Sequence, residues 1–480
     1  MSEKLSHTGG LARRSVSPFE VGAQSIANVA PSAVIAFGPA GMAASAGNGA
    51  WFSFFLGTLI VLVIAYSIVI FTRRRAGAGS LYSLVRPALG PKGAFLTGWA
   101  LFVGVIGIAS GSLAGAGFFL SRVLDSVGIS LFESVGGQII LDVLLLLGAI
   151  YLTVTSVRLS ARVSAFLEVL SIALIVVCLV VIFFKSGHVI DTNQLKLSGA
   201  TGDGIVFAIV LAILGFVGFE GAAALGEEST DPFRVIPRAI VGSAFFAGFL
   251  YIFATYTQVA QFKGGAAALA KSASPMDELT DQWGLSSLHP FLDFGFAASF
   301  FAVVVACITV GARLLFGMGN EGIVPGWFGV AHPKHRTPAH ALFVVVPIVA
   351  VPTIVVLLEG VEPLAATTYI DTVGVFGYML AYIVVCLGSP FFARRRGYGK
   401  VGWAWVMGIL GIAALLYVYY RSLVPVPAAP LNALPYYFVA ALIVGLAGYA
   451  VLCVKDPERA ARAGSFADDA EPTLRNEEVS

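Results

Sequence analysis

Twelve hydrophobic runs follow one another along the chain, separated by short segments that hold most of the charged residues. A helix that crosses the hydrocarbon core of a bilayer needs about 20 mostly apolar residues. Each run is close to that length or longer. The pattern therefore predicts twelve membrane-spanning helices, at residues 19–44, 48–71, 92–121, 138–157, 162–184, 204–226, 235–262, 288–318, 339–358, 364–392, 402–421 and 434–454.

Two of these runs are interrupted near the middle by residues that disfavour a continuous helix. The first is broken at Asn28–Ala33 and the sixth at Gly215–Glu220. A break within lipid is costly unless the freed backbone groups line a cavity. Interrupted helices at corresponding places in two halves of a chain mark the substrate site of inverted-repeat secondary transporters. We therefore expect the two breaks to meet at a binding site.

The two interrupted runs divide the chain into two units of five spans. Because five is odd, the second unit begins on the opposite side of the membrane, as an inverted repeat requires. The predicted segments are a cytoplasmic N-terminal segment at 1–17, a transmembrane domain at 18–455 with repeats at 19–184 and 204–392 and added helices at 402–454, and a disordered cytoplasmic tail at 456–480.

Composition and charge agree with a membrane protein. Hydrophobic residues make up 58% of the chain and charged residues 12%, about half the usual charged fraction of a soluble domain. The net charge of +2 gives no reason to expect nucleic acid. The positive-inside rule places both termini in the cytoplasm of a plasma-membrane protein. Only six of the 29 Lys and Arg would then lie outside, namely Arg122, Lys185, Lys196, Lys263, Lys271 and Arg421.

Motifs for enzyme chemistry are absent from the sequence. The four cysteines, Cys178, Cys307, Cys386 and Cys453, all lie in apolar runs, where Cys is usually a small buried hydrophobe. No Cys and His spacing suggests a metal site, and no catalytic triad or phosphate-binding loop appears. We expect neither enzyme activity nor a cofactor.

The first break offers a subsite for an anionic group. Pro31 removes a backbone donor, and the small side chains of Ala30 and Ala33 let a ligand approach the main chain. A half-helix that begins after such a break directs free N–H groups toward an anion. We predict that these residues, with Asn28 and Ser32, bind a substrate carboxylate. The alternative is a simple proline kink.

The second break carries Glu220, an ionisable residue within a membrane span. Such residues are rare there and are candidates for function. Glu220 could carry a coupling proton, bind a substrate amine or cap free N–H groups of the break. The predicted contributors to the pocket are Gly215, Phe216, Gly218 and Phe219, although the aromatic pair could equally serve packing.

Three further acids lie within or near the predicted spans. Glu168 is early in the fifth span and Asp142 near the external end of the fourth, so both are expected at the membrane interface. Asp371 lies near the external part of the tenth span, where it could belong to an external gate.

Three stretches of sequence resemble the amino acid–polyamine–organocation (APC) permeases. The second break, followed by Gly226–Pro232 and Ile236–Ala239, is similar to the helix 6–7 signature of that family. The loops after the second and eighth spans carry the other two stretches, at 76–99 and 312–338. The resemblance covers about residues 18–455.

The resemblance implies a leucine-transporter-type fold in which helices 1, 3, 6, 8 and 10 surround a central site. It also implies that the cargo is an amino acid or an amine derivative. The substrate carboxylate would meet Pro31, Ser32 and Ala33, and its amine would meet main-chain carbonyls of helices 1 and 6. Asn28 falls where several members have a polar residue facing the site.

Several positions depart from the family pattern. Pro31-Ser32-Ala33 replaces a common Gly-Ser-Gly, and Leu214 stands where members often have an aromatic gate, so it is also predicted to line the site. The fifth span has no Lys, which removes one route to proton coupling.

The resemblance to the family also bears on the coupling ion and on partner proteins. Glu220 stays the leading proton candidate, and Ser299 and Thr309 are weaker candidates for a sodium site. Residues 122–137 contain no Cys, so a disulfide-linked subunit is not expected. The predicted partners are the substrate, H⁺ or Na⁺, and the lipid bilayer.

Several functions stay open at this point. The sequence favours ion-coupled, secondary-active import of a small or neutral amino acid by alternating access. A polyamine or organic amine importer and an amino acid exchanger of the same fold are alternatives. A substrate sensor is disfavoured, because the segment after Asp456 is too short for an output domain.

Overall fold

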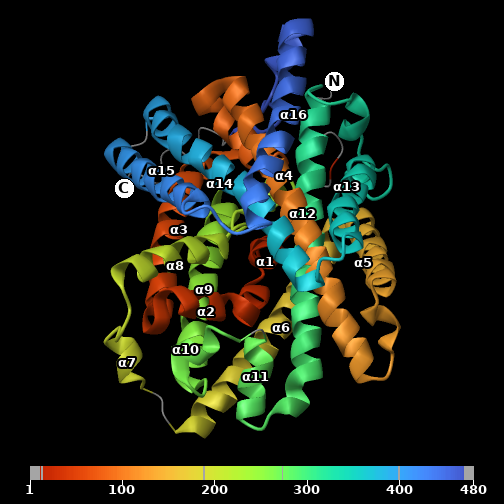
Figure 1. Ribbon diagram of the computed structural model, residues 1–480. Helices are drawn as coiled ribbons and strands as arrows, with labels where there is room; N and C mark the ends of the chain where they lie inside the picture. The colour runs from red at the N-terminus through yellow and green to blue at the C-terminus, as the bar shows by residue number, and fades with distance from the viewer. Residues whose placement is uncertain (1–10, 12–14, 188–189, 273, 398–399, 470–480) are drawn as a thin grey trace.

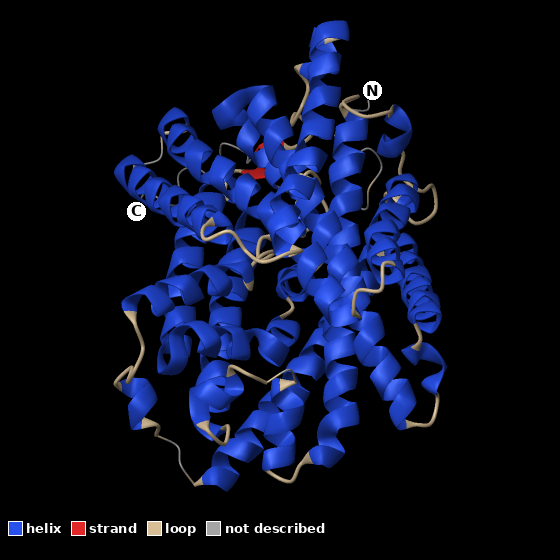
Figure 2. Cartoon of the chain, viewed as in Figure 1, coloured by secondary structure: helices blue, strands red, loops and turns tan. Residues whose placement is uncertain are grey.

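The computed structural model describes residues 11, 15–187, 190–272, 274–397 and 400–469. Within these residues the structure is almost entirely helical, and the long helices run between two opposite ends of the molecule (Figures 1 and 2). Ten helical stretches in the described ranges are long and apolar enough to cross a membrane. These features indicate a multi-pass membrane protein.

The helices fall into an earlier and a later group along the chain. The earlier ones are α1 (Pro18–Val29), α2 (Pro31–Ala46), α3 (Ala50–Thr72), α4 (Leu81–Ser126), α5 (Val135–Thr155) and α6 (Val157–Ser186). The later ones are α7 (Thr192–Leu195), α8 (Gly202–Leu214), α9 (Pro232–Gln261), α10 (Gly265–Leu269), α11 (Pro275–Gln282), α12 (His289–Asn320), α13 (Ala339–Leu358), α14 (Pro363–Arg395), α15 (Val401–Leu423), α16 (Leu434–Lys455) and α17 (Pro457–Ala460).

Short elements connect these helices. The 3-10 turns are η1 (Gly47–Gly49), η2 (Ser130–Glu133), η3 (Gly221–Leu225), η4 (Ser286–Leu288), η5 (Gly326–Gly329) and η6 (Leu431–Ala433). One antiparallel pair of two-residue strands, β1 (Arg75–Ala76) and β2 (Asp468–Asp469), is the exception to the predicted all-helical class in the described part of the chain.

The ten long stretches differ from the twelve predicted spans in two regions, the first two runs and the sixth run. The predicted runs at 19–44 and 48–71 fall within one helical stretch, Pro18–Thr72. In the predicted run at 204–226 the α-helical part ends at Leu214, where α8 (Gly202–Leu214, 13 residues) ends. A helix of n residues is about 1.5n Å long, so α8 alone is too short to cross the hydrocarbon core.

Glycines bring α4 and α14 into close contact at the centre of the molecule. A Cβ at Gly107 would lie 2.6 Å from the Gly374 nitrogen, and a Cβ at Gly377 would lie 2.5 Å from the Ala100 oxygen. Gly104 and Gly111 occupy the same face of α4, three and four residues from Gly107. Small residues at this spacing allow membrane helices to approach backbone to backbone.

The predicted disordered tail is wrong for residues 456–469. The Glu321 carboxylate accepts the N–H groups of Gly464 (2.9 Å) and Phe466 (2.6 Å). The Phe466 ring is buried against Phe316, with ring centroids 6.0 Å apart. These contacts hold the segment to the rest of the chain even though its composition is polar. Residues 470–480 lie outside the described residues.

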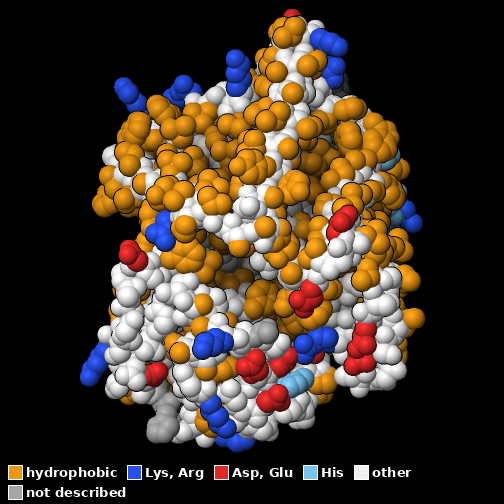
Figure 3. Space-filling model, in the orientation of Figure 1, with side chains coloured by type: hydrophobic (Ala, Val, Ile, Leu, Met, Phe, Trp, Pro, Cys, Tyr) orange, Lys and Arg blue, Asp and Glu red, His pale blue; other side chains and the backbone are white. Residues whose placement is uncertain are grey.

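The two ends of α12 define two opposite faces of the molecule. We call the end that carries α10 and α11 the α11 face, and the end that carries Glu321 and residues 456–469 the tail face. Between them, hydrophobic side chains cover a broad area over α13, α15 and α16, whereas most visible acidic side chains gather toward the α11 face (Figure 3). Exposed residues such as Tyr436 and Val454 suit contact with lipid.

Candidate binding cavity

The first predicted break is confirmed between α1 and α2. Ala30 adopts φ 48° and ψ 62°, a left-handed conformation that is uncommon for a residue other than glycine. It immediately precedes Pro31, whose ring disfavours helical geometry in the residue before it. Pro31 then begins α2 as its first residue, where the missing N–H is tolerated. The chain thus changes direction at Ala30 and restarts as a second half-helix.

The second predicted break is confirmed between α8 and η3. α8 ends at Leu214, and the chain turns at Gly218, which has φ +95°. A Cβ at Gly218 would lie 2.8 Å from the Asn28 oxygen. Glycine is therefore required here both for the backbone conformation and for contact with the first break. The two interruptions, 190 positions apart in sequence, lie against each other.

A cavity of about 100 Å³ lies where the two breaks meet. It is bounded by the two broken helices and by α4, α12 and α14, the helices that correspond in order to the predicted third, eighth and tenth spans. The lining residues are Asn28, Val29, Ala30, Ala33, Val34, Phe37, Ile108, Ser112, Leu214, Gly215, Val217, Phe300, Val303 and Asp371. Five predicted site residues, Asn28, Ala30, Ala33, Leu214 and Gly215, are among them.

The remaining predicted residues of the second break lie behind the cavity wall. Phe216 packs edge-on against Tyr251 at a ring separation of 5.0 Å, and Phe219 packs against Tyr382 at 5.4 Å. Both rings therefore serve packing, which was one of the two roles expected for them.

Glu220 and Gly218 meet the same tyrosine. The Tyr382 hydroxyl donates to the Glu220 carboxylate and accepts the Gly218 N–H at 3.1 Å. Glu220 is only 1% exposed and is not among the lining residues. It therefore holds the shape of the second break against α14 through Tyr382.

Glu168 occupies a place that the sequence did not predict. Its carboxylate accepts the Ser32 N–H at 3.3 Å, the Ser32 hydroxyl at 3.1 Å and the Ser299 hydroxyl at 2.7 Å. The expectation that Glu168 lies at the membrane interface is wrong, because this side chain is 1% exposed and joins α6 to α2 and α12. Pro31 and Ser32 are not lining residues, and the Ser32 N–H already has a partner.

Two other expectations about acids and ions also change. Asp142 is 1% exposed and accepts the Gln138 amide at 3.2 Å, so its carboxylate packs inside the protein in the first third of α5. Ser299 and Thr309 lie ten residues apart on α12, about 15 Å along the helix, and cannot share one sodium ion. Thr309 donates to the Val305 carbonyl at 2.7 Å.

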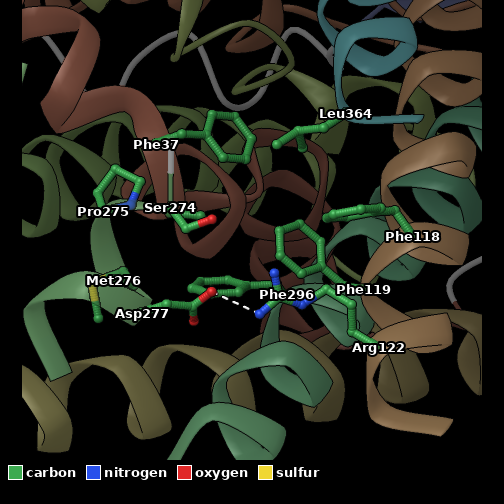
Figure 4. A pocket seen from close by; sticks show the side chains of 11 residues that line it. Phe37, Phe118, Phe119, Arg122, Ser274, Pro275, Met276, Asp277, Phe296 and Leu364 are labelled. Carbon is green, nitrogen blue, oxygen red and sulfur yellow. Dashed lines mark hydrogen bonds and ion pairs between the residues drawn. The ribbon is translucent and has the colours of Figure 1, made fainter. Parts of the chain in front are cut away.

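Aromatic rings separate the cavity from the α11 face. Phe37 stacks on Phe300 at 6.3 Å, and Phe119 contacts Phe296 at 5.1 Å and Phe300 at 5.9 Å. Phe37 also borders a second, smaller pocket of about 30 Å³, where Phe118, Phe119 and Phe296 lie opposite Met276 and Asp277 (Figure 4). The rings thus form one layer between the two spaces.

An ion-pair cluster closes the same route. Arg122 of α4 bonds to Asp277 of α11 at 2.7 Å and to Asp293 of α12 at 3.1 Å, and Figure 4 shows its contact with Asp277 at the small pocket. The cluster ties α11, which lies outside the long helices, to the end of α4.

Two ion pairs, one of them buried, lie toward the tail face. Arg313 of α12 forms two bonds with Glu228, at 2.9 and 2.8 Å, and both side chains are almost fully buried. Glu20 of α1 pairs with Arg162 of α6 at 2.7 Å. Val16 donates to the Glu228 carbonyl at 2.8 Å. Contacts between helices therefore lie on both sides of the cavity, toward the α11 face and toward the tail face.

Sequence reasoning missed the polar stripe on α14. Asp371, Tyr378 and Tyr382 lie seven and four residues apart, a spacing that puts them on one helix face. Asp371 lines the cavity, whereas it was expected at an external gate. The repeat of polar groups within an apolar run was the available signal.

Two broken helices around a central cavity, inside a multi-pass membrane protein, are the features of a secondary-transporter fold. The amino acid permease family model matches residues 23–447, most of the chain. The protein therefore belongs to this family of the APC superfamily, and it is a transmembrane permease rather than an enzyme.

Similar proteins support the same assignment. The branched-chain amino acid permease of Lactococcus lactis is 27% identical over 369 residues, which cover 73% of this chain and 76% of its own. A low-affinity putrescine importer of Escherichia coli K12 is 25% identical over 72% of this chain and 74% of its own. The crystal structure of MhsT in complex with L-phenylalanine matches with a TM-score of 0.57 at 15% identity, over 84% of this chain and 98% of that one.

Proposed function

We propose that this permease imports a small amino acid across the plasma membrane by alternating access. The observation that carries the proposal is the cavity at the junction of the two broken helices. An engineered protein cavity of about 150 Å³ binds benzene, so a cavity of about 100 Å³ has the size that a small organic molecule can fill. That volume suits a compact ligand better than a long one.

The proposed architecture has twelve membrane crossings. The pairs α1–α2 and α8–η3 each count as one crossing, and the ten remaining crossings are the other long helices. Residues 19–184 and 204–392 form the two inverted repeats, and α15 and α16, which cover the predicted helices at 402–454, are additions. The positive-inside pattern supports a cytoplasmic tail face and an external α11 face.

Transport in this scheme needs the closures on the two faces to open in turn. The Arg122 cluster and the aromatic layer would part toward the α11 face. The Arg313–Glu228 and Arg162–Glu20 pairs would part toward the tail face. Each closure joins side chains of different helices or of a helix and a loop, so movement of one group of helices against the other can open it.

Glu220 is the proposed proton carrier. It is buried in the second break and accepts a hydrogen bond from Tyr382, so gain or loss of a proton would change the hydrogen bond that holds the break to α14. We expect Glu220→Gln to abolish uptake driven by a pH gradient while retaining exchange of internal for external substrate. Full gradient-driven uptake by this variant would exclude the role.

A second candidate function is import of a small organic amine. Asp371 is the one charged group among the described lining residues, and a putrescine importer is among the relatives. An anionic wall favours a ligand with net positive charge.

Uptake by purified protein in liposomes tests both functions. Labelled alanine, leucine and putrescine would be offered under an imposed inward proton gradient, with protein-free liposomes as the control. Accumulation of an amino acid that collapses with a protonophore supports the first function. Accumulation of putrescine alone supports the second, and accumulation of none of the three contradicts both.

A further inference from the structure

Asp371 takes no part in the ion pairs described on the two faces or in the described hydrogen bonds that hold the two breaks. It lies on α14, half-buried, in the wall of the cavity. Its Oδ1 is enclosed and has no hydrogen-bond partner among the described residues. A carboxylate removed from water without a partner costs free energy, and a ligand that supplies the partner recovers it.

The backbone of α4 makes room for this carboxylate. A Cβ at Gly111 would overlap the Asp371 carboxyl group, so any residue other than glycine there would displace it. Gly111 belongs to the glycine face on which α4 and α14 approach. The close helix contact therefore fixes where Asp371 meets the cavity.

At the first break the main chain offers few donors to an anion and presents the carbonyl end of α1. At the start of α2, Pro31 has no N–H and the Ser32 N–H is bonded to Glu168. Ala33 is the next residue of this first turn, and it borders the cavity. The end of α1 at Val29 also borders it, and the last carbonyls of a helix carry partial negative charge.

We infer that Asp371 binds the ammonium group of the transported molecule. The cavity then selects small molecules with a primary ammonium group and places that group between Asp371 and the carbonyl end of α1. A carboxylate on the same molecule would meet the Ala33 N–H. This inference rests on the proposed function, because it assigns a subsite within the proposed transport cavity.

Binding of three matched compounds tests the assignment. Alanine has both an ammonium and a carboxylate, lactate replaces the ammonium by a hydroxyl, and ethylamine lacks the carboxylate. Purified full-length protein would be titrated with each in a calorimeter. We expect alanine and ethylamine to bind wild type at least tenfold more tightly than lactate. A hydrogen bond to a charged group supports a loss on the order of 10- to 100-fold in Asp371→Asn.

Variants separate recognition from folding. Asp371→Asn should weaken alanine and ethylamine and leave lactate unchanged, and Asp371→Glu should restore part of the loss. Asp281→Asn, which removes an exposed acid from α11, should bind all three like wild type.

The contradicting outcomes are distinct. Unchanged alanine and ethylamine affinity in Asp371→Asn, or lactate binding as tightly as alanine to wild type, overturns the ammonium subsite and leaves the proposed transport function standing. Absence of binding of all three to wild type, together with absence of uptake in liposomes, overturns the proposed function and the subsite with it.

Discussion

The tie between Glu168 and the first break should be measurable as stability. Glu168→Met keeps the side-chain size but removes the acceptor for the Ser32 N–H, the Ser32 hydroxyl and the Ser299 hydroxyl. Interhelical hydrogen bonds in membrane proteins contribute about 0.6 kcal/mol on average and about 1.7 kcal/mol at most. Three such bonds give an expected loss of about 2–5 kcal/mol in the free energy of unfolding.

Partial substitutions should give smaller losses in a defined order. Ser299→Ala removes one bond, so we expect a loss of about 0.6–1.7 kcal/mol. Glu168→Gln should lose about 1 kcal/mol or less, because its amide oxygen can still accept from Ser32 and its nitrogen can donate to the Ser299 hydroxyl. Ser164→Ala is the matched control on α6, since the Ser164 hydroxyl has no partner among the described residues.

Unfolding in mixed micelles with increasing SDS, followed by tryptophan fluorescence, measures these losses. The double variant Ser299→Ala/Glu168→Met should be no less stable than Glu168→Met, because both remove the same bond. A loss below about 0.5 kcal/mol for Glu168→Met, or additive losses in the double variant, would refute the assigned network.

Two further predictions concern the second break and the tail. Gly218→Ala places a Cβ at φ +95° and 2.8 Å from the Asn28 backbone oxygen, so we expect the free energy of unfolding to fall by about 2 kcal/mol or more and uptake to be reduced. Gly242→Ala, on an open face of α9, is the control and should change neither. Thermal unfolding and liposome uptake measure the two effects. Burial raises the pKa of Glu321 above its ordinary value despite its hydrogen bonds from Tyr82, Phe466 and Gly464. A folded state with a raised carboxyl pKa binds more protons than the unfolded state, so its contribution to stability is complete below the unfolded pKa and is lost as pH rises through the folded pKa. Unfolding free energies measured from pH 4 to 7 should therefore contain a decline that Glu321→Gln removes, and an identical slope in that variant would count against the burial argument.

The sequence predicted the two breaks because their causes are local. Pro31 disfavours helix at Ala30, and Gly218 permits the positive φ of the second turn. It did not predict Glu168 or Asp371, because hydropathy gives the length of a span but not which neighbours a given side chain faces. The depth of Glu168 follows from Ser32 and Ser299, which lie more than 100 positions away in the chain.

The tail illustrates the same limit. Residues 456–469 are polar and short, and local composition is typical of disorder. Their order depends on Glu321, on the Tyr82 hydroxyl that donates to it and on β1, all of which are distant in sequence. A single polar segment does not reveal such partners.

Access to the cavity from both sides of the membrane tests the central claim most directly. Ser112→Cys, placed in a variant whose four native cysteines are replaced, would report on a lining position. Membrane-impermeant thiol reagents would be applied to either side of oriented proteoliposomes, with and without the transported compound. Alternating access predicts labelling from each side, with protection by that compound. Labelling from one side only, or labelling unaffected by the transported compound, would contradict a central alternating-access site.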